Sequence, residues 1–100
     1  MRHDVLMSHP SLDGRIFRDI TDVRAGDVGA ETTFEYHQHE DHTVWARYEG
    51  GSVRLGYLVG VRTGDSLAFR YVHITSSGET AAGRCTSTIE KLPDGRLRMR

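Results

Sequence analysis

The sequence predicts an all-β fold, a single antiparallel up-and-down meander that curls into a small barrel of seven or eight strands. Beyond residue 13, apolar side chains alternate with polar ones and do not sustain the spacing of a helix face. Turn-forming residues interrupt this alternation about every 10–15 positions, which is typical of small sandwiches and barrels. Glycines inside the predicted strands mark bends, and they favour a curled barrel over a flat sheet: Gly56, Gly60 and Gly83.

Seven strands are expected, each bounded by glycine, proline, serine or acidic turn residues. In chain order they cover residues 14–21, 32–40, 43–50, 52–62, 66–75, 80–92 and 96–100. The first, GRIFRDIT, ends at the glycine-rich breaker RAGDVGA. The second and third, TTFEYHQHE and TVWARYEG, each alternate a face rich in apolar side chains with a more polar face.

The fourth strand, SVRLGYLVGVR, follows the Gly50-Gly51 turn. Both of its faces are apolar, so its orientation stays open. The fifth and sixth, SLAFRYVHIT and TAAGRCTSTIEKL, are long alternating runs, and RLRMR follows the Asp94-Gly95 turn. This last strand ends while its alternation is still running and leaves an edge to be covered. We therefore expect closure with seven strands, cover by a second copy, or a longer natural chain.

Composition and charge indicate one ordinary globular domain of 100 residues, which we divide into a tail at 1–12 and a barrel at 13–100. The net charge is −1 and the arginines are scattered, so we expect neither nucleic acid nor membrane as a partner. Cys85 is the single cysteine and excludes an intramolecular disulfide. No apolar run resembles a signal peptide, which makes the cytoplasm the expected location. We expect no cofactor.

Histidines and acids are concentrated in the stretch EYHQHEDH. His37 and His39 share a strand face with Glu35, and His42 follows at the turn. Imidazole with carboxylate suits zinc, nickel or copper, but an exposed site would lack the supporting contacts that hold metal ligands in place. We interpret these side chains as a solvated surface, with a weak surface metal site as the alternative.

The opposite face of the same strands gathers polar groups among apolar ones. Buried polar groups are costly unless paired, so this set is either a hydrogen-bonded core network or the lining of a cavity for one small ligand. We expect Cys85 to be an inert, half-buried thiol rather than a nucleophile. The candidate ligand-binding residues are Tyr36, Gln38, Tyr48, Tyr71, His73, Cys85 and Ser87.

Six blocks of sequence resemble a known family: TTFEYHQ, VWARYEGGSV, GYLVG, LAFRYVHI, SGETAAGRCTST and LPDGRLRM. Together they are similar to small bacterial proteins built as avidin-like or lipocalin-like barrels, many of which carry the label N-acetylglutamate synthase. The resemblance implies the barrel fold over residues 13–100 and assigns no catalytic residue. Because the chain lacks a Gly-rich loop between a strand and a helix, we do not expect synthase activity.

Three functions remain open from the sequence. The first is non-catalytic binding of a neutral or weakly polar organic molecule inside the barrel. The second is an enzyme of the cyclase or isomerase type in the same cavity, with His73 as the acid–base group. The third is an interaction module that pairs through its open edge strand. That edge also predicts a homodimer, with Trp45 and Tyr57 as its apolar centre.

Overall fold

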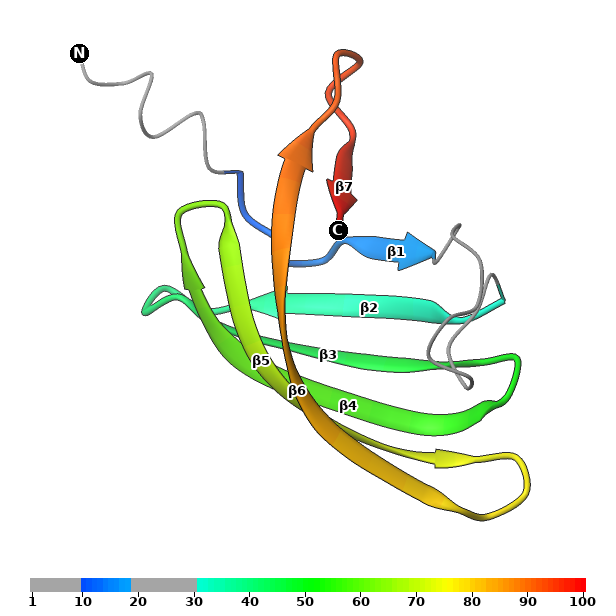
Figure 1. Cartoon of the computed structure of the whole chain (residues 1–100). Helices are drawn as coiled ribbons and strands as arrows, with labels where there is room; N and C mark the ends of the chain where they lie inside the picture. The colour runs from blue at the N-terminus through cyan, green and yellow to red at the C-terminus, as the bar shows by residue number, and fades with distance from the viewer. Residues whose placement is uncertain (1–9, 19–30) are drawn as a thin grey trace, which may run out of the picture.

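The computed structural model describes residues 10–18 and 31–100, and these form a nearly closed antiparallel barrel in which strand order follows chain order (Figure 1). Its strands are β1 (Ile16–Arg18), β2 (Thr33–Gln38), β3 (Thr43–Gly50), β4 (Val53–Thr63), β5 (Ser66–Thr75), β6 (Thr80–Lys91) and β7 (Leu97–Met99). The predicted meander is therefore confirmed. Residues 19–21 of the first predicted strand, and residues 1–9 of the predicted tail, lie outside the described part.

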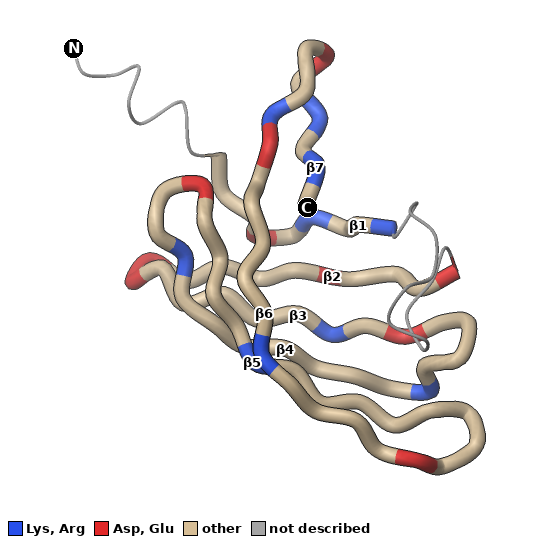
Figure 2. Tube along the Cα trace, in the orientation of Figure 1, with Lys and Arg blue, Asp and Glu red and all other residues tan. Residues whose placement is uncertain are grey.

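Tight turns join the strands where glycine permits a left-handed backbone. Gly50 and Gly51 have φ values of 117° and 62°, and Gly95 has a φ of 91°, so both predicted turn dipeptides are confirmed. A side chain at Gly50 would also collide with the backbone carbonyl of Glu31. The acidic segments lie mainly in turns and at strand ends (Figure 2).

The structure resolves the orientation of β4. Its even-numbered residues face inward: Gly56, Leu58, Gly60 and Arg62. Tyr57, Val59 and Val61 point outward and are exposed. A register shift between Val53 and Leu55 turns Val53 back into the core. The two faces looked alike in the sequence because the outward side is also apolar.

The core lies between the curled strands, and the segment before β1 covers one end of it. Leu12 is fully buried there and belongs to the core cluster. Two backbone hydrogen bonds dock the following residues on β2: Gly14 N donates to Tyr36 O at 2.9 Å, and Tyr36 N donates to Arg15 O at 2.8 Å. The packed part of the chain thus extends to residues before 13.

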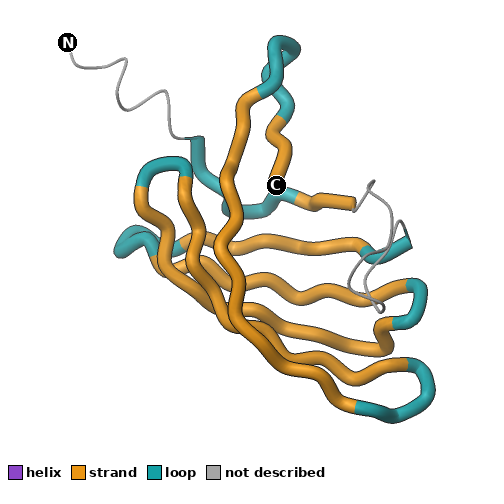
Figure 3. Tube along the Cα trace, viewed as in Figure 1, coloured by secondary structure: helices purple, strands orange, loops and turns teal. Residues whose placement is uncertain are grey.

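At the other margin of the sheet, β6 runs past β5 and forms a projecting hairpin with β7 (Figure 1). The end of β7 returns toward β1, and Met99 and Phe17 both pack against the core. Strands and loops make up all of residues 10–18 and 31–100 (Figure 3). This part of the chain holds no helix long and apolar enough to cross a membrane.

Candidate functional site

The inner face is organised in layers, each made of residues that lie opposite one another on neighbouring strands. The first layer, nearest the turn that joins β3 to β4, contains Phe34, Tyr48, Gly56 and His73. The next contains Tyr36, Ala46, Leu58, Tyr71 and Gly83, and the third contains Gln38, Val44, Gly60, Phe69 and Cys85. A short fourth layer contains Arg62, Leu67 and Ser87.

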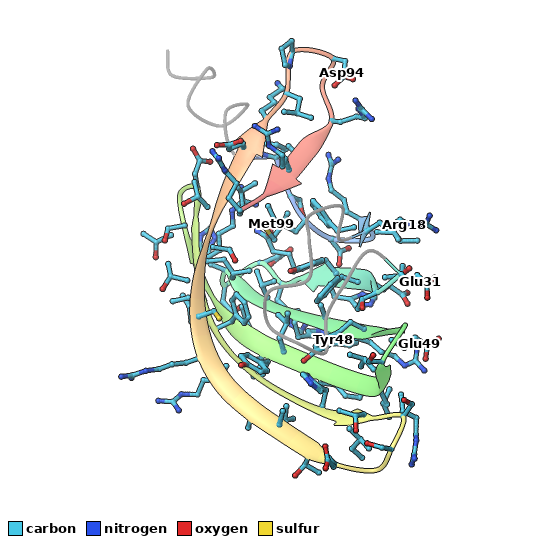
Figure 4. The ribbon with its side chains drawn as sticks, turned by 45° about the vertical axis from the view of Figure 1, so that its right-hand side comes forward. Arg18, Glu31, Tyr48, Glu49, Asp94 and Met99 are labelled. Carbon is cyan, nitrogen blue, oxygen red and sulfur yellow. The ribbon has the colours of Figure 1, made fainter. Side chains whose placement is uncertain are left out.

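Tyr48 and His73 form the polar centre of the first layer. The Tyr48 hydroxyl and His73 Nδ1 share a hydrogen bond of 2.9 Å, and both side chains are buried. Phe34 stacks on Tyr48 with ring centroids 4.7 Å apart. Tyr48 lies on the inner, concave side of the sheet (Figure 4). Gly56 lies between the two strands and makes room, because a Cβ there would be 2.5 Å from the Tyr48 ring.

Two further tyrosines extend this centre into the second layer. Tyr71 stacks on His73 at 5.9 Å with an interplanar angle of 14°, and its hydroxyl lies over Gly83. Tyr36 meets Phe17 edge-on at 5.2 Å. Burial, and to a smaller extent the neighbouring Tyr48, raise the pKa of Tyr36 above its usual value. Four of the seven candidate residues, Tyr36, Tyr48, Tyr71 and His73, are therefore brought together.

Gln38 lies apart from that cluster and has a structural partner. Its Oε1 accepts hydrogen bonds from Leu12 N and from Arg62 Nη1, both at 3.0 Å. Arg62 is only 4% exposed, and it also donates to the carbonyls of Pro10 and Gly64. Burial lowers the pKa of Arg62. The sequence interpretation missed Arg62. It could have been found because Arg62 lies four residues after Leu58 on the same strand, and residues an even number apart share a strand face.

Cys85 and Ser87 lie on the inward positions of β6, one layer apart. Ser87 is half-buried, opposite Leu67. Cys85 is exposed, so the expectation of a half-buried thiol is wrong. Within the described residues the last strand pairs with β6 at Ile89–Lys91, two backbone hydrogen bonds between Arg100 and Thr88 extend this pairing by one residue, and no strand flanks the free side of Cys85. Phe69 and Tyr71 are also only partly buried, so this side of the concave face is open to solvent.

The histidines of the opposite face contact Trp45. His37 stacks on Trp45 with ring centroids 4.2 Å apart, and Trp45 Nε1 donates to His39 Nε2 at 3.3 Å. His37 also lies 3.7 Å from a carboxylate oxygen of Glu35. Across residues 10–18 and 31–100, no group of three or more histidine, cysteine or acidic side chains is placed to hold a metal ion.

Comparison with known proteins agrees with the barrel geometry. The family described as "Avidin-like protein" matches residues 10–100. The chain belongs to the avidin-like family. Avidin-like barrels typically bind small molecules. No curated protein and no solved structure matches the chain.

Proposed function

We propose that this avidin-like protein binds a small, neutral or weakly polar organic molecule on the inner face of its barrel. The observation that carries the proposal is the cluster of Tyr36, Tyr48, Tyr71 and His73 beside a part of the concave face that solvent reaches. Ligand sites combine apolar walls with a few fixed polar groups that set orientation. The rings supply the walls here, and the hydroxyls and the imidazole supply the polar groups.

The seven candidate residues have different parts in this proposal. Tyr71 and His73 stack at the edge of the buried cluster and would orient the ligand. Cys85 and Ser87 would line the open side along β6, where solvent reaches the thiol. Gln38 already accepts two hydrogen bonds, so it would shape the end of the site rather than bind the ligand strongly.

A binding experiment with a matched pair of variants tests the proposal. A panel of neutral aromatic and heterocyclic compounds is screened by thermal shift, and hits are measured by calorimetry. Tyr71→Phe removes one hydroxyl from the inner face and should weaken binding about 3–10-fold. Tyr57→Phe makes the same change on the outer face and should leave binding unchanged. Equal effects of the two variants, or no binder in the panel, would contradict an interior site.

The second candidate function is an enzyme of the cyclase or isomerase type. The observation in its favour is the 2.9 Å hydrogen bond between Tyr48 and His73, which could pass a proton between a ligand and the protein. Recovery of a bound ligand separates the two functions. A binding protein returns it unchanged by NMR, whereas an isomerase converts it at a rate that His73→Gln abolishes.

The location and assembly expected from the sequence remain part of this proposal. We expect the protein in the cytoplasm and as a homodimer. Pairing through an edge strand remains the third possibility, and both margins of the described sheet, β1 and β7, are only three residues long. Short edges such as these discourage strand addition, whereas the free side of β6 beside Cys85 is longer and is the edge on which such pairing would occur.

A further inference from the structure

The outer face of the barrel carries an apolar strip at its centre. Four large side chains of β4 and β5 are exposed there: Tyr57 by 44%, Val59 by 56%, Val61 by 58% and Val72 by 51%. Trp45 lies directly opposite Val59 on β3 and borders a shallow depression of about 350 Å³. Contiguous apolar surface of this kind is typical of an interaction site.

Charge is distributed unevenly on the two sides of the strip. Arg70 on β5 and Arg84 on β6 are exposed and lie directly opposite each other, which is unfavourable for like charges. No acidic residue occurs in β5 or in β6 before Glu90, and within residues 10–18 and 31–100 neither arginine forms an ion pair. On the other side of the strip, β2 carries the exposed Glu35.

We propose that two copies of this chain pack their outer faces together about a two-fold axis parallel to β4, so that Arg84 of each copy meets Glu35 of the other. Such an axis reverses the order of strands across the interface, because each strand on one side of β4 faces its counterpart on the other side. β6 of one copy then faces β2 of the second copy. The apolar strip packs against itself at the centre.

The side chains on the flanks suit this arrangement. For this axis, the residue of the second copy in the same row as Arg84 is His37. Glu35 lies two residues from His37 on β2, about 7 Å along the strand, a separation that an arginine can span. Arg70 of one copy faces Trp45 of the other, and an arginine over an indole is a favourable contact. The face is convex, so groups at its flanks must be long to meet. Glutamate and arginine meet that requirement, and they relieve the repulsion between Arg70 and Arg84.

Charge reversal in the full-length chain tests the proposal by sedimentation equilibrium across a hundredfold dilution. Wild type should show a monomer–dimer equilibrium. Arg84→Glu alone, or Glu35→Arg alone, should raise the dimer Kd about tenfold or more, because each creates two like-charge contacts. An equimolar mixture of the two variants should recover the wild-type Kd, since both contacts of a heterodimer then join an arginine to a glutamate.

Lys91→Glu is the matched control, because it reverses the same charge on β6 beyond the end of β5 and should leave the Kd unchanged. Circular dichroism establishes that each variant is folded. If Arg84→Glu fails to fold, Arg84→Gln takes its place and should raise the Kd by a smaller factor. A wild type that is monomeric at every concentration overturns the proposal. So does a dimer insensitive to both reversals, as expected if another surface associates. A mixture that stays monomeric shows that these two charges do not meet.

Discussion

Replacing Gly56 by alanine should destabilise the barrel by about 2–3 kcal/mol. The new Cβ would be 2.5 Å from the Tyr48 ring and 2.8 Å from His73 Cβ, where ordinary contacts are 3.4–4 Å. Tyr48 cannot move away easily, because Phe34 stacks on one side of it and His73 is hydrogen-bonded to its hydroxyl. Overpacking of this kind costs about 1–3 kcal/mol, and a disturbed hydrogen bond adds about 1 kcal/mol. The φ of Gly56 is not positive, so restriction of the unfolded chain returns only about 0.4–1 kcal/mol.

Urea denaturation measures this loss as a fall in the midpoint at constant slope. A double-mutant cycle with Tyr48→Leu identifies the cause, because leucine lacks the ring atoms that the new methyl group would meet. In that background Gly56→Ala should cost at least about 1 kcal/mol less than in wild type. Additive effects, or a loss below about 0.5 kcal/mol in wild type, would refute the packing described for the first layer.

Three further predictions concern other parts of the barrel. Hydrogen bonds from Arg98 lower the pKa of Glu90, so their stabilisation of the β6–β7 hairpin is complete above the unfolded pKa and is lost as pH falls toward the folded one. The protection factors of the β7 amides, which are the ratios of the intrinsic to the observed exchange rate at each pH, should therefore fall between about pH 5 and pH 3; a Glu90→Gln variant with the same pH dependence would exclude this cause. The raised pKa of Tyr36 means that stability falls as pH rises above about 10, the unfolded value, and Tyr36→Phe should flatten that fall in alkaline urea titrations; an unchanged slope would argue against it. Tyr71→Ala should cost about 1–3 kcal/mol in urea and Arg70→Gln less than about 0.5, since only Tyr71 packs its ring against the core; the reverse order would contradict the assignment of faces.

The fold could be predicted because alternation and turn chemistry are local properties. Every strand expected from the sequence occurs, and the turns at Gly50-Gly51 and Asp94-Gly95 lie where glycine was needed. The orientation of β4 could not be predicted, because Tyr57 and Val59 make its outward face as apolar as its inward one. Sequence reasoning assumes that the apolar face of a strand is the buried one, and this assumption fails where the solvent-exposed face is also apolar.

The candidate site was predicted in part for the same reason. Residues that share a strand face are obvious from the sequence, so Tyr71 and His73 were placed together correctly. Which strands cover which parts of that face depends on strand pairing, and β7 proved too short to cover Cys85. The contact of Arg62 with Pro10 joins positions 52 residues apart, so no local sequence pattern predicts it.

That distant contact has a consequence for how the chain folds. Every strand pairs with its neighbour in sequence, so most of the sheet can assemble by adding one hairpin to the next, without closing large loops. The hydrogen bond from Arg62 to Pro10 needs β1 to β4 in place, and we expect it to form after the rate-limiting step. Arg62→Gln should then accelerate unfolding and leave the refolding rate nearly unchanged in stopped-flow experiments. The buried arginine would then slow the unfolding of the barrel, and so lengthen the lifetime of the folded state, without changing the rate at which the barrel folds.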